Sequence, residues 1–348
     1  MAAPRVSVLM TTWNGAGFIG ASLGSVLRQS FSDFEVIVVD DGSTDGTARV
    51  VAAIGDPRLR LLRLPANGGI VAARNAGFAV ATGTYIAALD HDDLADPDRF
   101  ARQVAFLDAH PEIVLAGTEI RIDDHGTLRR PDHPRQGDAL ALRWQLLIDN
   151  PLTWSSVMFR ADSVRRLGGF MRGAYEPADD FDFYHRLLAV GGIVRLDEVL
   201  TTYRYHGGNA SHAAAERLNH NAARVLEAAY MPWFGAGAMA AAELVVRHLS
   251  DRQPVRDRAT LVRIGEIVET LFAGFCAVHH PSAEDRDRLA ASVGRLWWRV
   301  VRAAVRSGGP GLVRVHRRMA MLAGFHRPGV ADVMMSVGVG VIRGVVRR

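Results

Sequence analysis

The sequence predicts an α/β fold in which helices flank a mostly parallel sheet and an all-helical C-terminal extension follows. The strand–loop–helix pattern recurs four times within about the first 110 residues, which is typical of a parallel sheet covered on both faces. The loops after these strands, TTWN, DDGSTD, NGG and DHDD, are rich in carboxylates, amides and glycines and should meet at one sheet edge. From about residue 211 onward the apolar spacing is helical.

Each expected strand is an apolar run bounded by turn residues. The helix after the first strand carries Ile19, Leu23 and Val26 on one face. The runs occupy residues 5–10, 34–39, 59–64, 85–89, 113–122, 154–159, 193–196 and 200–205.

Two helix starts are marked by acidic residues. After the fourth strand, Asp96 should cap a helix and Pro97 should take its first position. Asp179 and Asp180 should open a later helix, where the helix dipole favours negative charge. Between these two helices, residues 123–136 read as a polar and mobile loop.

Three carboxylates crowd the loop after the fourth strand: Asp90, Asp92 and Asp93. Carboxylates this close repel one another unless a cation lies between them, and a hard divalent ion with oxygen ligands fits such a site. The alternative is a solvated acidic turn that only leads into the next helix.

Composition narrows the class of protein. The chain of 348 residues is long enough for more than one domain. Its single cysteine, Cys276, cannot form an internal disulfide, and the first residues lack the pattern of a signal peptide, so we expect a cytoplasmic protein. The sequence contains neither a phosphate-binding GxxxxGK[ST] loop nor GxGxxG after a strand, which argues against the usual ATP and dinucleotide sites.

The C-terminal segment is strongly basic. Residues 288–348 contain 12 arginines and one acid, Asp332, a net charge of +11. Interleaved apolar residues such as Trp297 and Trp298 suggest helices that lie on an anionic membrane surface. Alternatively, these faces pack on the rest of the chain or on a second subunit. No recognition motif supports nucleic acid as a partner.

Six blocks of the sequence together resemble the family 2 glycosyltransferases, which have the GT-A fold. The resemblance covers roughly residues 4–211 and says little about the tail. Two positions depart from the family pattern: the usual proline of the first loop is Met10 or Thr11, and the usual Glu-Asp is Asp179-Asp180. The blocks are RVSVLMTTWN, QSFSDFEVIVVDDGSTDGT, NGGIVAARNAG, YIAALDHDD, GGF with ADDFDFYHRL, and YRYHGGNAS.

The resemblance implies a role for each matching residue. Asp180 would be the base that removes the proton of the acceptor hydroxyl. Asp92 and Asp90, with Asp93 nearby, would hold Mn²⁺ or Mg²⁺, and His206 resembles a histidine that completes such a site. Asp40 could instead be only a turn former. The residues expected to bind substrate are Thr11, Asn14, Asp40, Asp41, Asn67, Arg74, Asp90 and Asp179.

The resemblance also implies an activity and a division of the chain. We expect an inverting, metal-dependent transferase that moves a sugar from a UDP- or TDP-sugar to a saccharide or lipid-linked acceptor in the synthesis of a bacterial surface polysaccharide or glycolipid. Residues 1–110 would bind the donor, 111–211 the acceptor, and 212–348 would form the helical region. Alternatives are a sugar-nucleotide nucleotidyltransferase and an inactive, nucleotide-binding partner of another transferase.

Overall fold

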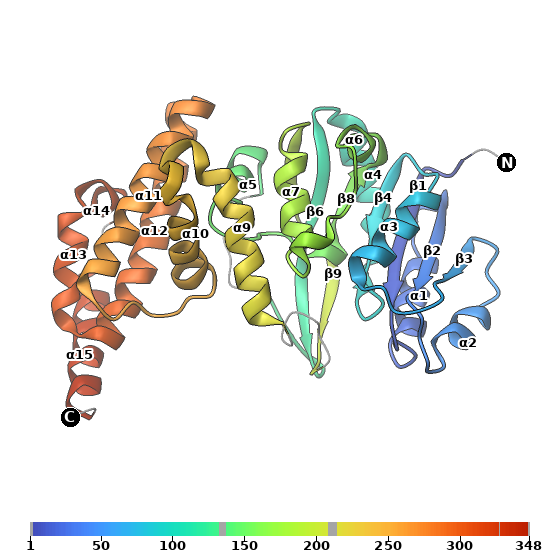
Figure 1. The fold of residues 1–348 in the computed structure, drawn as a ribbon, viewed down its shortest axis with the longest axis horizontal. Coiled ribbons are helices and arrows are strands. Elements are labelled where there is room, and N and C mark those ends of the chain that lie inside the picture. Colours follow the sequence, from blue (N-terminus) through green and yellow to red (C-terminus); the bar gives the residue numbers. More distant parts are fainter. Residues whose placement is uncertain (1–2, 132–136, 208–213, 327, 347–348) are drawn as a thin grey trace. The chain divides into compact units, whose positions relative to one another are not determined.

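The structure, a computed structural model, describes residues 3–131, 137–207, 214–326 and 328–346 (Figure 1). It divides into two compact units. The first contains Met1–Arg143 and Asn150–Leu218, and the second contains Trp144–Asp149 and Asn219–Arg348. The helical unit therefore includes a short segment from the middle of the chain, which the sequence does not suggest.

The first unit is built on one mixed sheet with the order β3-β2-β1-β4-β8-β6-β9-β5, with β7 paired to β6. The four N-terminal strands of this order are parallel to one another, as are β6 and β9, whereas β8 and β5 run antiparallel to their neighbours. The predicted α/β fold with a mostly parallel sheet is confirmed. The strands are β1 Val6–Thr12, β2 Phe34–Asp40, β3 Leu59–Arg63, β4 Tyr85–Ala88, β5 Leu94–Ala95, β6 Ile113–Asp124, β7 Thr127–Arg129, β8 Met158–Arg160 and β9 Gly192–Tyr205.

Helices pack on this sheet through the apolar faces that the sequence marks. Ile19, Leu23 and Val26 of α1 are all fully buried and belong to one core cluster with strand residues such as Val8 and Val36. The helices of this unit are α1 Ile19–Leu27, α2 Thr47–Ala52, α3 Ile70–Val80, α4 Arg99–Ala109, α5 Ala139–Gln145, α6 Ala161–Arg166 and α7 Asp179–Leu187, with 3-10 turns at Trp154–Ser156 and Gly173–Tyr175.

Three expectations about local structure need correction. The helix expected at Asp96 and Pro97 begins instead at Arg99. Asp96 directly follows the short strand β5, and its backbone N–H still donates to the carbonyl of Leu200 in β9. The strand expected over 154–159 is a 3-10 turn followed by β8. Part of the expected loop over 123–136 forms the β6–β7 hairpin, and residues 132–136 lie outside the described part.

The second unit is helical, as expected. The first helix of the C-terminal region begins at Ala215, and the second unit contains it from Asn219 onward. The central α12 buries Trp297 and Val301 completely, and Trp144 from the inserted segment meets the rings of Phe272 and Phe275 edge-on. The helices are α9 Ala215–Phe234, α10 Ala238–Val245, α11 Arg258–His279, α12 Ala283–Gly308, α13 Val313–Arg318, α14 Ala320–Phe325 and α15 Val330–Val346, with a π turn at Val246–Ser250.

The packing of this unit bears on the expected membrane surface. Trp297 is fully buried and Trp298 is 5% exposed, so the two tryptophans face the interior, as the alternative interpretation requires. Met334 and Met335 of α15 are exposed. Among the described residues, none of the helices is sufficiently long and apolar to cross a membrane.

Candidate active site

The loops after β1 and β2 are bonded together at the carboxyl edge of the parallel sheet. Asn14, whose φ is +51°, accepts a hydrogen bond from the N–H of Thr44 on its Oδ1 at 2.9 Å, and its own N–H donates to Ser43 Oγ at 2.8 Å. The expectation that these loops meet at one sheet edge is therefore confirmed. Asn14 itself supports the loop pair, and its expected contact with substrate stays a prediction.

Two adjacent aspartates, Asp40 and Asp41, connect these loops to the rest of the edge. Asp40 is fully buried and accepts bonds from the N–H of Ser43 and from Arg63 Nε, an arrangement that favours its interpretation as a turn former. Asp41 accepts from the N–H groups of Gly68 and Gly69, each at 2.9 Å. It thereby fixes the third loop, in which the exposed Asn67 also accepts from Gly69.

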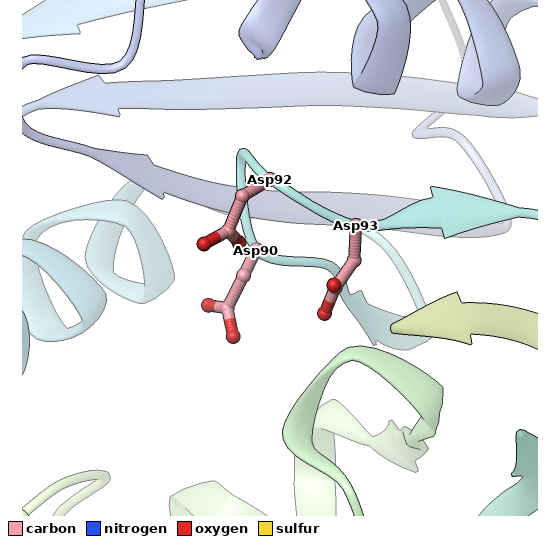
Figure 2. A group of neighbouring side chains, drawn as sticks. All are labelled: Asp90, Asp92 and Asp93. Atoms are coloured by element: carbon pink, nitrogen blue, oxygen red, sulfur yellow. The ribbon is translucent and has the colours of Figure 1, made fainter. Parts of the chain in front are cut away.

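The carboxylates of Asp90, Asp92 and Asp93 lie within 4.8 Å of one another in the loop after β4 (Figure 2). Asp90 and Asp92 are partly exposed and have their side chains next to each other, whereas Asp93 is 1% exposed. Asp93 accepts from the N–H of Arg204, and burial raises its pKa well above the usual range. Asp90 and Asp92 are therefore the pair that a ligand can reach.

His206 lies against this pair. Its Nε2 is 3.1 Å from Asp92 Oδ2, and its ring stacks on Phe18 with the centroids 4.4 Å apart. The imidazole is thus held in one orientation beside a carboxylate. The structure brings the expected ligands Asp90 and Asp92 into one cluster with Asp93, and it places the third expected ligand, His206, beside Asp92.

A buried arginine connects the acidic cluster to the helix that carries the expected base. Arg74 on α3 is 5% exposed; its Nη1 donates to Asp179 at 2.5 Å, and its Nη2 lies 3.6 Å from Asp90 Oδ1. The guanidinium lies over the ring of Trp154, 4.2 Å from the centroid. Burial alone would lower the pKa of Arg74, but the neighbouring carboxylates raise it, so the arginine stays charged.

Asp180 opens α7 beside Asp179 and is held by two donors. Its Oδ1 accepts from the N–H of Phe181 at 2.7 Å, and its Oδ2 accepts from Asn150 Nδ2 at 2.9 Å. Burial and then the charge of Asp179 raise the pKa of Asp180 to about 7, against the opposing effect of Arg74. This differs from the ionised carboxylate that an ordinary pKa near 4 would give at neutral pH, and it suits a group that gains and loses a proton.

The remaining expected residue, Thr11, lies near the end of β1 and is 7% exposed.

Three residues of the site were not found from the sequence: Asn150, Ser155 and Tyr184. Ser155 Oγ accepts from the N–H of Asp90 at 3.0 Å, and the hydroxyl of the fully buried Tyr184 has no hydrogen-bond partner among the described residues. Only Tyr184 had a signal, its position one helical turn after Asp180.

The open sheet and the carboxylates beyond its strand ends define a class of α/β enzyme that binds its ligand at this edge. Residues 7–168 match the model of Glycosyl transferase family 2. This region, a little under half of the chain, is therefore similar to glycosyltransferase family 2.

Two curated relatives are similar over the same region. The succinoglycan biosynthesis protein ExoO of Rhizobium meliloti is 32% identical over 235 residues, which are 62% of this chain and 65% of ExoO. The putative glycosyltransferase EpsE of Bacillus subtilis is 34% identical over 174 residues, which are 48% of this chain and 60% of EpsE. The matches thus span less than two thirds of either relative.

Solved structures show the same fold over nearly the whole chain. TarS 1–349 of S. aureus in complex with UDP-GlcNAc has a TM-score of 0.56 at 17% identity and covers 99% of this chain and 91% of TarS 1–349. The mannosyltransferase PcManGT of Pyrobaculum calidifontis, in complex with GDP-Man and Mn²⁺, has a TM-score of 0.52 at 19% identity and covers 100% of this chain and 89% of PcManGT. The expected GT-A fold with a helical C-terminal region is confirmed.

Proposed function

We propose that this protein is a glycosyltransferase that moves a sugar from a UDP- or TDP-sugar to a hydroxyl acceptor with inversion at the anomeric carbon. The observation that carries the proposal is the buried chain of contacts from Asp90 through Arg74 to Asp179, next to Asp180. It joins a cluster able to hold a metal and a diphosphate to a carboxylate able to accept a proton.

The donor side of the reaction rests on the acidic cluster. Carboxylate oxygens within 4.8 Å of one another suit a hard divalent cation that contacts each of them at about 2.0–2.6 Å. Asp90, Asp92 and His206 would hold Mn²⁺ or Mg²⁺, and such an ion would supply positive charge beside the leaving diphosphate. Asp41, Asn67 and the loops they fix would contact the nucleotide.

The acceptor side rests on Asp180. A sugar hydroxyl is a poor nucleophile, and a positioned carboxylate that accepts its proton contributes about 10²–10⁴-fold to the rate. Attack by that hydroxyl on the face opposite the departing diphosphate would invert the anomeric centre. A group with a pKa of about 7 can take this proton near neutral pH.

The acceptor and the location of the reaction are proposed from the relatives and the charge of the tail. ExoO is a succinoglycan biosynthesis protein, which supports a surface polysaccharide or glycolipid as product. We assign the donor to residues 1–110 and the acceptor to 111–211, and we place the enzyme in the cytoplasm at the inner face of the plasma membrane. The family match disfavours a nucleotidyltransferase, and the complete set of Asp90, Asp92 and Asp180 disfavours an inactive partner.

A screen of nucleotide sugars tests the proposal. UDP-, TDP- and GDP-sugars are incubated with the full chain, with and without Mn²⁺, and release of the nucleoside diphosphate is measured. We expect metal-dependent release from a UDP- or TDP-sugar that Asp180→Asn lowers at least about 100-fold. Release by the variant at the wild-type rate would contradict the role of Asp180, and release without any divalent ion would contradict the metal site.

A further inference from the structure

The loop from Asn150 to Ser156 contacts carboxylates of the candidate site at both of its ends. Asn150 Nδ2 donates to Asp180 Oδ2 at 2.9 Å, and Ser155 Oγ donates to Asp90 Oδ2 at 3.3 Å. This loop joins α5 to β8 and belongs to none of the sequence blocks that resemble the family. Its contact with Asp180 therefore needs its own explanation.

The orientation of the Asn150 amide is fixed by a second hydrogen bond. Its Oδ1 accepts from the N–H of Leu152 at 3.1 Å, so its Nδ2 is the atom that faces Asp180. Because an amide nitrogen can only donate, it stabilises the ionised form of a carboxylate more than the protonated form. The backbone beyond is anchored as well, since the carbonyl of Pro151 accepts from the buried Arg195 at 2.8 Å.

We propose that Asn150 is a positioning residue that holds the carboxylate of Asp180 in one orientation and favours its ionised form. Three other groups face Asp180. The charged Arg74 from α3 also favours its ionised form, whereas the charge of Asp179 on α7 opposes ionisation. The hydroxyl of Tyr184, also on α7, is neutral. Asn150 provides a neutral side-chain donor to Asp180, beside the backbone N–H of Phe181. For its catalytic meaning the inference rests on the role proposed for Asp180.

Removing the amide should raise the pKa of Asp180. A hydrogen bond to a charged group is commonly equivalent to a shift of about one pKa unit or more. Asn150→Ala should therefore raise the pKa by about one unit, and Asn150→Asp should raise it further because a second negative charge faces the carboxylate. A residue that only packs would not produce this order.

Thermal unfolding of the full chain without ligand measures the effect. In the wild-type background, Asn150→Ala should lower the melting temperature more at about pH 9, where Asp180 is ionised, than at about pH 5.5, where it is protonated. In the Asp180→Asn background the loss should be equal at the two pH values. Asn75→Ala is the matched control, because Asn75 also makes two side-chain bonds, both to Met171, but none to Asp180.

Two outcomes would overturn the inference: an equal loss at both pH values with Asp180 present, or a pH-dependent loss that persists with Asp180→Asn. Should Asn150→Asp fail to fold, Asn150→Ala alone decides. Calorimetry with UDP and Mn²⁺ should give wild-type affinity for Asn150→Ala, because the donor site is unchanged. The unfolding experiment needs no turnover, so it can succeed even if the proposed transfer reaction fails, and the nucleotide-sugar screen decides that reaction separately.

Discussion

Asp180 is the residue whose surroundings change its chemistry most. Burial raises its pKa to about 7, so the rate should rise with pH through about 7 and level off above it. The sign for stability is opposite. The folded protein holds the proton between about pH 4 and pH 7 while the unfolded chain has lost it, so this residue lowers the stability progressively over that window.

Asp180→Asn should accordingly gain stability relative to wild type as the pH rises. Between about pH 4.5 and pH 8 we expect the difference in free energy of unfolding to move in favour of the variant by about 2–4 kcal/mol, at 1.36 kcal/mol per pKa unit. Denaturant titrations at the two pH values measure it. A difference that does not change with pH would mean that Asp180 titrates near its ordinary pKa.

A second prediction for a single residue concerns Asp92. Asp92→Asn keeps the shape of the side chain and removes one charged oxygen from the acidic pair. The variant should unfold like wild type and should lose at least about tenfold of the affinity for UDP that Mn²⁺ provides, a loss comparable to that of other single changes around metal ligands. Calorimetry with UDP, with and without Mn²⁺, measures both numbers, and UDP affinity without metal serves as the control.

The residues that sequence reasoning finds and misses differ in their chemistry. Asp90, Asp92 and Asp180 are short acidic groups in dense local patterns, and crowded charge is visible in a sequence. Asn150 and Ser155 have neutral side chains and act through hydrogen bonds to residues 30 and 65 positions away, and no local pattern records such a pair. Asp40 shows the converse: its type suggested a ligand contact, whereas its two oxygens are bonded within the protein.

At the scale of elements, the parallel strands were predictable because both faces are covered, so each reads as a continuous apolar run. The helix start at Arg99 was not, because Asp96 carries a cap residue's side chain while its backbone is bonded to Leu200 of β9. Pairing between distant strands thus decided a boundary that local preferences favoured elsewhere. Local preferences failed in the same way over residues 154–159, where a strand was expected and a 3-10 turn precedes the short strand β8.

The junction of the donor-side loops yields a prediction about Gly42. Its φ is +69°, and an added Cβ would lie 2.6 Å from the carbonyl carbon of Ala66 and 2.7 Å from the nitrogen of Asn67. Gly42→Ala should therefore force the second and third loops apart and destabilise the chain by about 1–3 kcal/mol, with weaker UDP binding.

Gly55→Ala is the matched control for this change. Gly55 has a similar φ of +66°, but nothing lies within 4 Å of an added Cβ. It should cost only the backbone strain, about 1 kcal/mol, and leave UDP binding unchanged. Equal losses of stability and affinity in the two variants would show that the contact between the loops is unimportant. Chemical denaturation and calorimetry provide the comparison.

At the scale of the whole molecule, the sequence predicted two kinds of architecture in the right order but not how the chain passes between them. The segment Trp144–Asp149 leaves the first unit and joins the helical one, where Tyr230 donates to the carbonyl of Leu147 and Ser250 donates to Asp149. The two hydrogen bonds join residues that are 83 and 101 positions apart in the sequence, and no local sequence pattern connects them. Helical spacing and charge, in contrast, depend on composition and could be read directly.

Two substitutions in the basic tail distinguish packing of its tryptophans within the protein from contact with a membrane. Trp297 is fully buried in the helical unit, so Trp297→Ala should destabilise the protein by about 3–5 kcal/mol through the cavity it leaves. Met334 is 69% exposed, and Met334→Ala should change stability by less than about 0.5 kcal/mol. Thermal and denaturant unfolding of the full chain compare the two.

Sedimentation with anionic vesicles completes this test. The net charge of +11 over residues 288–348 should make the full chain pellet at low salt and release as salt screens the attraction. Because Trp297 faces the interior, Trp297→Ala should pellet like wild type at a temperature where it stays folded, whereas Met334→Ser with Met335→Ser should pellet less. If Trp297→Ala instead unfolds like wild type and loses vesicle binding, the tryptophan reaches the lipid, and the packing of α12 in this structure is not the one present at the membrane.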